Sequence, residues 1–215
     1  MTDDLLQHIV SCTNKKMEIL PPAEKYPEKA YAKLIDIVDL LAYLGILYMR
    51  GLYPMNGHRI DTLFSDIHGH PVFSATMSRQ RFQFILANLI FDDAEDRPAR
   101  WQCDRFAAMW YVFEECNKSF ARVMIPECYL SLDETLYPMR TQTNFRQYNP
   151  DKPAKYGMLF KSINSATYPY TYQSHVYCGK PKSEPNEFYI SGMENYIQYL
   201  VNKLSSYHEI GRAHV

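Results

Sequence analysis

SLDETLYPMRTQTNFRQYNPDKPAKYG, residues 131–157, is the stretch of this chain that decides its fold. It opens with alternating polar and apolar residues, which predict a strand that carries the carboxylate of Asp133. The composition then turns basic, with seven Lys or Arg against one acid between residues 139 and 182, and eight aromatic residues lie among them. A carboxylate on a strand beside a basic, aromatic surface suits metal-assisted chemistry on a polyanion.

The alternation predicts two different faces for the strand at residues 129–139. Asp133 falls on one face, whereas Glu134 falls on the other and is interpreted as structural. Two further strands are predicted at 156–164 and 170–178, with residues 165–169 as a short connection typical of a hairpin. We therefore expect a three-stranded antiparallel sheet with Asp133 near its middle, followed by a helix at residues 191–204.

The chain before residue 129 is predicted to be helical. Helical spacing of apolar residues occurs behind Thr2, at residues 34–48, behind Ser78 and at residues 104–122. In the helix behind Ser78, Arg81 is predicted to lie off the apolar stripe. Residues 56–76 are interpreted as a loop with a short helical piece near residue 63.

Composition excludes several classes of protein. Hydrophobic residues make up 47% of the 215 residues, enough for one large domain or two small ones, and the net charge is −1. Five cysteines without a CxxC pair indicate reduced thiols rather than a disulfide framework or a zinc site. With no signal peptide and no apolar run long enough to cross a bilayer, we expect a soluble protein that does not bind a membrane.

Three stretches together resemble the piggyBac transposase family. They are the motif at residues 131–140 with 145–157, the stretch FSATMSRQRFQFILANLIFDD at 73–93, and the stretch YLGILYMRGL at 43–52. The resemblance runs from about residue 3 to about residue 208, and its motifs are long and specific. The sequence is therefore expected to share the fold and the ancestral chemistry of that family.

The resemblance implies an α+β fold in two parts. Residues 1–128 would form a helical domain similar to the family's dimerisation and DNA-binding domain, and 129–209 an incomplete ribonuclease H-like catalytic domain of three antiparallel strands and a helix. Asp133 matches the first of the family's three catalytic aspartates, which hold Mg²⁺, and is thus both the catalytic and the metal-binding candidate. DNA is the implied partner, in the nucleus, with a possible homodimer and no small-molecule substrate.

Four basic residues of the matched motif are candidates for DNA contacts. They are Arg140, Arg146, Lys152 and Lys155. The alternative interpretation is a solvated surface, because long basic side chains also cover apolar surface with their stems.

The sequence departs from the family pattern in two ways, and its last residues look artificial. Ile163 and Asn164 stand where the family often has Cys-Asp, and the second and third catalytic carboxylates do not occur before Val215. Residues 210–215, IGRAHV, match the translation of a common sequencing adapter, although Gly-Arg also occurs in the family near this point. We therefore expect a fragment that does not cleave DNA as written, and whether it is an enzyme stays open.

Three interpretations of function remain at this point. The leading one is a fragment of a piggyBac-type DNA transposase or of a protein derived from one. A domesticated, non-catalytic DNA-binding or interaction protein is the second. The third is a partial gene model without a functional product. The two missing acids in a longer transcript would favour the enzyme.

Overall fold

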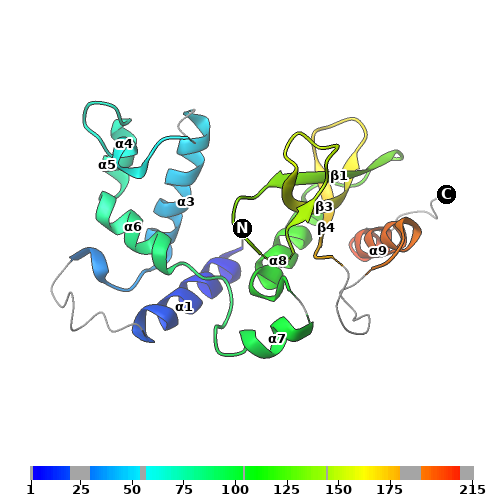
Figure 1. The fold of residues 1–215 in the computed structure, drawn as a ribbon, viewed down its shortest axis with the longest axis horizontal. Coiled ribbons are helices and arrows are strands. Elements are labelled where there is room, and N and C mark those ends of the chain that lie inside the picture. Colours follow the sequence, from blue (N-terminus) through cyan, green and yellow to red (C-terminus); the bar gives the residue numbers. More distant parts are fainter. Residues whose placement is uncertain are drawn as a thin grey trace. The chain divides into compact units, whose positions relative to one another are not determined.

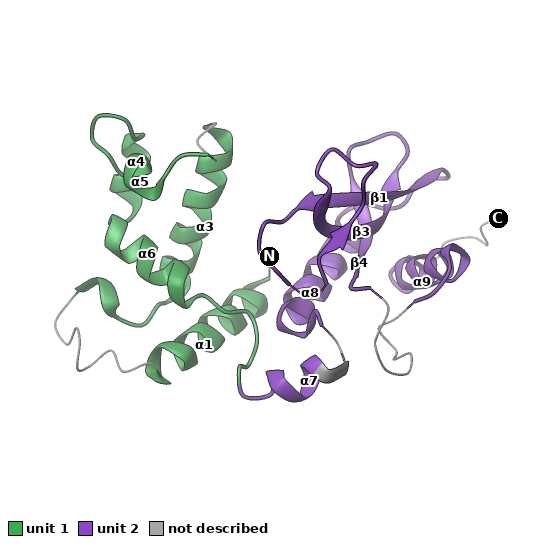
Figure 2. Cartoon of the chain, in the orientation of Figure 1, with its two compact units in different colours: residues 1–94 green, residues 95–215 purple. Residues whose placement is uncertain are grey.

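The structure is a computed structural model that describes residues 2–19, 30–53, 57–103, 105–143, 145–179 and 190–208, without the side chains of residues 102 and 103. The chain divides into two compact units, residues 1–94 and 95–215 (Figure 2). The adapter-like residues 210–215 lie outside the described residues. Each unit has its own buried core.

Unit 1 is helical, as the sequence predicts (Figure 1). Its elements are α1 (Asp3–Ile19), a 3₁₀ turn η1 (Ala30–Ala32), α3 (Ile37–Leu52), α4 (Ile60–Leu63), α5 (Pro71–Thr76) and α6 (Arg79–Asn88). Local capping fixes where two of these helices begin. Asp36 and Asp39 form a capping box at the start of α3, and the hydroxyl of Ser78 accepts the backbone N–H of Arg81 at the start of α6.

Helix α5 lies where the sequence predicts a loop. His70 is its N-cap, because the ring Nδ1 accepts the backbone N–H of Val72 at 3.2 Å. Pro71 occupies the first turn, where a missing N–H costs nothing. Histidine is not among the usual capping residues, and six residues are too few to show helical periodicity.

Arg81 corrects a second prediction, because its side chain is buried rather than turned away from the apolar stripe. Only 5% of the residue is exposed. Its guanidinium contacts the carboxylate of Asp39 at 2.7 Å and also donates to the carbonyls of Tyr31, Lys33 and Leu34. Burial opposes ionisation of Asp39, but the hydrogen bond and charge of Arg81 lower the pKa of that carboxyl. The buried charge of Arg81 is therefore paired and hydrogen-bonded.

Unit 2 combines helices with one sheet (Figure 1). Its elements are α7 (Arg97–Cys103), α8 (Ala107–Val123), β1 (Leu130–Pro138), β2 (Gln147–Tyr148), β3 (Tyr156–Ser165), β4 (Thr171–Tyr177) and α9 (Met193–Ser205). The three predicted strands and the last helix are confirmed, whereas α7 and the two-residue β2 were not predicted. Helix α8 begins at Ala107, and Asp104, where the prediction began, lies outside the described residues.

The sheet is antiparallel, with β3 between β1 and β4, and β2 pairs with two residues at the start of β3. Asp133 thus lies near the middle of β1, although β3 rather than β1 is the central strand of the described sheet. The predicted hairpin is confirmed by the backbone bond from Ser165 N–H to Tyr170 O at 2.9 Å. Helices give way to strands near residue 129, as expected, but α8 lies with the sheet inside unit 2.

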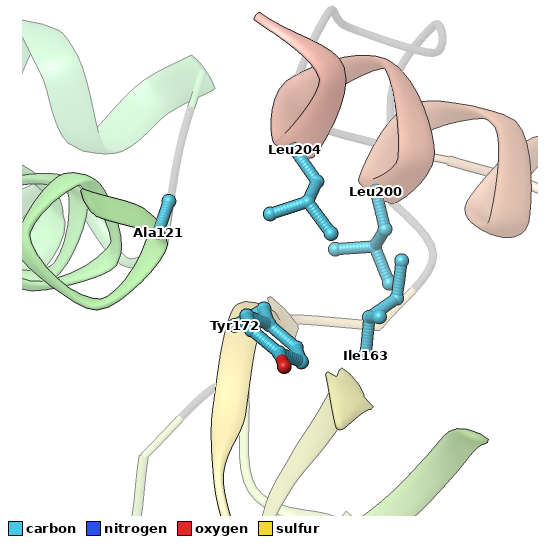
Figure 3. Close-up of a cluster of buried hydrophobic side chains, with 5 residues drawn as sticks. All are labelled: Ala121, Ile163, Tyr172, Leu200 and Leu204. Carbon is cyan, nitrogen blue, oxygen red and sulfur yellow. The ribbon is translucent and has the colours of Figure 1, made fainter. Parts of the chain in front are cut away.

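The core of unit 2 lies between the sheet and α9. Ile163 and Tyr172 of the sheet, Leu200 and Leu204 of α9, and Ala121 of α8 form a cluster of buried side chains (Figure 3). The outer edge of β4 is covered by a side chain, because the amide of Asn117 donates to Ser174 O at 2.9 Å and accepts Ser174 N–H at 3.1 Å. Asn117 therefore stands in for a neighbouring strand at that edge.

Two expectations about the chemistry of the chain can be compared with the described residues. Cys12, Cys116, Cys128 and Cys178 are thiols rather than halves of disulfide bonds. In the part of the chain that the structure describes, no helix is both long enough and apolar enough to span a membrane.

Candidate catalytic carboxylate and nucleic-acid interface

Asp133 is exposed on the face of β1 that alternation assigns to it. The register places Asp133 directly opposite Ser162 of β3, and Ser162 directly opposite Ser174 of β4. A row with one carboxylate and two hydroxyls therefore crosses β1, β3 and β4 on one face. The small serine side chains leave open space next to the carboxylate.

The Asp133 carboxylate is held by its own strand. One oxygen accepts the backbone N–H of Glu134 at 2.8 Å, and the other lies 3.5 Å from the Thr135 hydroxyl. The Glu134 side chain turns to the opposite face, where it forms an ion pair with Lys161 at 2.9 Å. The predicted orientation of Glu134 is therefore confirmed, and only Asp133 of this pair faces the open side of the sheet.

A groove of about 760 Å³ lies over the Asp133 face, and we call it the β1 groove. Its floor carries short polar side chains, namely Ser162, Asn164, Thr171 and Ser174 beside Asp133. Its walls are aromatic, with Phe113 and Phe120 of α8, Phe160 of β3, Tyr137 of β1, and Tyr168 and Tyr170 of the hairpin. Asp133 therefore adjoins a concave site of the size that binds small ligands.

The polar groups on the floor form a directed hydrogen-bond chain. The Thr171 hydroxyl donates to Asn164 Oδ1 at 2.7 Å, and Asn164 Nδ2 donates to Ser162 Oγ at 3.1 Å. Ser162 thus accepts a bond and keeps its own hydroxyl proton to donate. The family departure at Asn164 has a structural role, because its amide links two strands beneath the groove.

The four predicted DNA-contacting residues all lie on or beside the loop between β1 and β3, in different settings. Arg140 and Lys155 are exposed. Arg146 stacks 4.9 Å from the centre of the Tyr156 ring and donates to the Arg140 carbonyl at 3.3 Å. Lys152 is half-buried, and its ammonium donates to the Glu134 carbonyl of β1 at 2.9 Å.

These contacts join the basic loop to the strand that carries Asp133. Tyr148 and Tyr156 are more than half exposed beside Arg146, with ring centres 4.8 Å apart. The structure therefore brings a basic, aromatic surface and the carboxylate together in one unit, as the spacing of residues 131–157 suggests.

The donor set for a metal ion is incomplete among the described residues. Asp133 offers the hard oxygen ligands that Mg²⁺ prefers. Within the described ranges, however, no group of three or more His, Cys, Asp or Glu side chains could hold a metal ion. The described residues therefore fit one ligand position and do not by themselves form a two-metal centre.

Sequence reasoning missed the groove residues. The hairpin sets Ser162 opposite Ser174 of β4, but the pairing of Ser162 with Asp133 spans the long loop between β1 and β3, whose length does not fix the register. The aromatic wall from α8 could not be predicted from the sequence, because Phe113 and Phe120 look like ordinary apolar positions of an amphipathic helix. No local signal distinguishes a ring that lines a groove from one that fills a core.

Comparison with known proteins identifies the family. The family model described as transposase IS4 matches residues 1–213. A solved structure of a piggyBac transposase synaptic complex with hairpin DNA superposes with a TM-score of 0.82 at 26% identity, covering 96% of this chain and 41% of that one. This chain belongs to the piggyBac transposase family. The expected α+β fold, with part of a ribonuclease H-like domain, is thereby confirmed.

Curated human relatives agree with this family. PiggyBac transposable element-derived protein 3 of Homo sapiens is 27% identical over 124 residues, which are 57% of this chain and 20% of that protein. The human chimeric ERCC6-PGBD3 protein shows the same identity over 124 residues, covering 11% of its length. The chain therefore spans about a fifth or less of the curated relatives that it matches, and less than half of the solved transposase.

Proposed function

We propose that this chain is a portion of a piggyBac-type DNA transposase that binds DNA and positions Asp133 next to a DNA phosphate. The observation that carries the proposal is the exposed Asp133 carboxylate at the β1 groove, joined by the loop after β1 to a basic, aromatic surface. Support comes from the solved relative, which was determined with hairpin DNA. The activity of a whole transposase belongs to longer proteins than this chain.

The basic residues have distinct roles in this proposal. Arg140, Arg146 and Lys155 contact phosphates, with Arg146 held in place by its stacking on Tyr156. Lys152 uses one of its three donors on the Glu134 carbonyl and offers the others to DNA. It therefore also ties the DNA-contacting loop to the strand of Asp133.

Transposases of this type generally use a divalent metal, and Asp133 fits one of its ligand positions. We propose that Asp133 contributes oxygen ligands to Mg²⁺, with the remaining ligands coming from groups other than the described residues. Mg²⁺ is commonly held by one or two carboxylates together with phosphate oxygens and waters. Because the described donor set is incomplete, no catalytic step is assigned to this chain.

The remaining functional assignments follow the family. We propose that residues 1–128 act as a dimerisation and DNA-binding domain and 129–209 as the catalytic part, that the protein forms a homodimer, and that it works in the nucleus on DNA. No small-molecule substrate is assigned. The proposed dimer has a specific candidate surface on the outer face of α3.

A domesticated, non-catalytic DNA-binding protein is the second candidate function. The incomplete donor set favours it, because no group of three or more His, Cys, Asp or Glu side chains among the described residues could hold a metal ion, and Asp133 alone cannot hold two cations against the cost of dehydrating them. Both candidates bind DNA through the same loop. They differ only in whether DNA is cut, so binding and cleavage must be measured separately.

DNA binding is tested by fluorescence anisotropy with a labelled duplex at several salt concentrations. Removing one side chain that binds a phosphate should lower the salt slope by about 1 and weaken binding to all sequences alike. We expect this for Arg140→Gln, Arg146→Gln and Lys155→Gln. The matched control is Lys118→Gln, whose ammonium is paired with Glu115 at 2.6 Å and should leave the slope unchanged. Equal slopes for all four variants and the unmodified chain would contradict the proposed surface.

Cleavage is tested with the same purified chain, a plasmid carrying transposon ends, and Mg²⁺ or Mn²⁺. The incomplete donor set leads us to expect no excision, which favours the non-cleaving candidate for the chain as written. Excision that disappears in Asp133→Ala would show instead that the chain itself is catalytic.

A further inference from the structure

We propose that the β1 groove binds one unstacked nucleobase of the DNA strand that Asp133 faces. The choice of ligand rests on the proposed function, since the groove adjoins the carboxylate assigned to DNA. The shape and chemistry of the groove are independent of that assignment. Three features restrict the ligand that it can hold. They are the aromatic walls, the polar floor and the lack of Lys, Arg and His among the described residues that line it.

The walls of the groove offer aromatic faces at both ends. At one end the Tyr137 ring lies edge-on to Phe160, with centres 5.1 Å apart, and Phe113 lies 5.9 Å from Phe160. At the other end Tyr170 is fixed by its hydroxyl, which donates to the Phe120 carbonyl at 2.7 Å. Tyr137 and Tyr168 are each 57% exposed, so their faces are available for stacking. Aromatic faces stack on any of the four bases.

The floor of the groove offers hydrogen bonds to the edge of a planar ring. The chain from Thr171 through Asn164 leaves the Ser162 hydroxyl as a donor. The Ser174 hydroxyl is engaged, because it donates to Asn117 Oδ1 at 3.1 Å, and its oxygen can still accept. A donor beside an acceptor suits the polar edge of a base, which carries both kinds of group.

The charges around the groove exclude several other ligands. None of the described residues that line it is Lys, Arg or His, and one of them is the acid Asp133. A phosphate or another anion is therefore not favoured inside the groove. The hydroxyl and amide floor equally disfavours an apolar chain, because those groups would be buried without partners. A neutral, planar, polar ring remains as the ligand that satisfies both walls and floor.

The cations that a nucleotide needs lie outside the groove, on the loop after β1. Lys152 contacts the backbone of Glu134, the residue next to Asp133, and so places positive charge at that edge of the strand. A nucleotide can therefore place its base in the groove and its phosphate toward the loop. Because a paired base must first leave its stack, the groove should prefer an unpaired base.

The test uses the purified full chain and three probes. These are a single-stranded oligonucleotide with one 2-aminopurine, the same strand fully paired in a duplex, and the free 2-aminopurine deoxyriboside. Stacking on aromatic rings quenches 2-aminopurine fluorescence. We expect quenching of the free nucleoside; in the strands, where neighbouring bases already quench the probe, we expect a change in fluorescence for the single strand and a smaller change for the duplex.

The variants are Tyr168→Ala and Tyr137→Ala, with Tyr168→Phe as the conservative change. Removal of one stacking face should weaken single-strand binding about tenfold and abolish most of the quenching, whereas Tyr168→Phe should restore both. Tyr129→Ala is the matched control, since Tyr129 is 80% exposed and outside the groove lining. Neither wall variant should change duplex affinity.

The outcomes separate this inference from the proposed function. Quenching of the nucleoside without binding of any duplex would support the groove and overturn DNA binding by the basic loop. Duplex binding without quenching, or quenching that Tyr168→Ala and Tyr137→Ala leave intact, would overturn the nucleobase site while the proposed function stands. Binding of none of the three probes would overturn both.

Discussion

His175 is a buried histidine enclosed by aromatic side chains. It is 3% exposed, and its Nδ1 has no hydrogen-bond partner among the described residues. The rings of Trp110, Tyr196 and Tyr199 surround it at 6.0, 5.4 and 5.2 Å. Burial, with the positive charges of Lys203 and Lys161, lowers the pKa of His175 from 6.5 to about 4.

The lowered pKa of His175 predicts a pH-dependent stability. Between pH 6.5 and about 4 the unfolded chain binds a proton here that the folded chain does not. The free energy of unfolding should therefore have its full value above pH 6.5 and decrease as the pH falls toward 4. At about 1.4 kcal/mol per pH unit, the decrease from this group is about 3.5 kcal/mol over the whole range and about 2.5 kcal/mol by pH 4.5. Urea denaturation at pH 7 and at pH 4.5 measures it.

A variant isolates the contribution of His175. His175→Phe keeps a ring in the aromatic pocket without a titrating group, so its free energy of unfolding should fall less over this range. The control is His58→Phe at an exposed position, which should keep the dependence of the unmodified chain. An unchanged pH dependence in His175→Phe would show that other groups cause it.

At the scale of elements, the outer face of α3 is left uncovered by the described residues of unit 1. Its inner face is buried through Leu40, Tyr43 and Ile46. Its outer face exposes a second apolar stripe of Val38, Leu41, Tyr48 and Leu52, between 49% and 79% exposed. A helix that is apolar all round is normally covered on both sides.

The spacing of this outer stripe fits a second copy of the chain. Its members are nearly symmetric about Gly45, where an added Cβ would meet nothing within 4 Å. Two copies of α3 packed antiparallel would bring the same residues together from both sides, as a two-fold interface requires. This is the surface that we assign to the proposed homodimer.

A charge within the stripe should separate the dimer. Leu41→Glu would place a carboxylate in an apolar interface, and we expect the dissociation constant to rise at least about tenfold because burying an unpaired charge is costly. Sedimentation equilibrium measures the change. Ile67→Glu is the control, since Ile67 is 84% exposed and lies outside the stripe. A monomeric unmodified chain, or a dimer insensitive to Leu41→Glu, would contradict the assignment.

At the scale of the whole molecule, the two units should open independently. Ile85 of unit 1 and Leu200 of unit 2 are both fully buried in the cores of their own units. Ile85→Ala and Leu200→Ala should each cost about 2–5 kcal/mol through reduced burial and the remaining cavity. Hydrogen exchange followed by mass spectrometry should show faster exchange in residues 1–94 for the first variant and in residues 95–208 for the second.

Each of these two variants serves as the control for the other. Met193→Ala, at a position that is 45% exposed on the same helix as Leu200, should change exchange little in either unit. Faster exchange across both units from a single core substitution would show that they unfold as one cooperative body.

Much of the architecture could be predicted because its signals are local. The capping oxygen of Ser78, the alternation of residues 130–138 and the short hairpin connection each depend on residues only a few positions apart. Asp133 could be placed on a strand, and on the correct face, by the same kind of signal. The helices α5 and α7 were missed because each is short and lacks both periodicity and a usual cap.

The sequence by itself determined the order of the longer helices and the three main strands, the exposed face of Asp133 and the family, because backbone preferences and motifs act over short spans. Only the tertiary structure decided which distant groups meet. It joined Asp133 to Ser162 across two strands, set Asn117 against Ser174, buried Arg81 against Asp39 and tied Lys152 to Glu134. Such contacts depend on how the chain closes its loops and packs its faces, and no local preference specifies that choice.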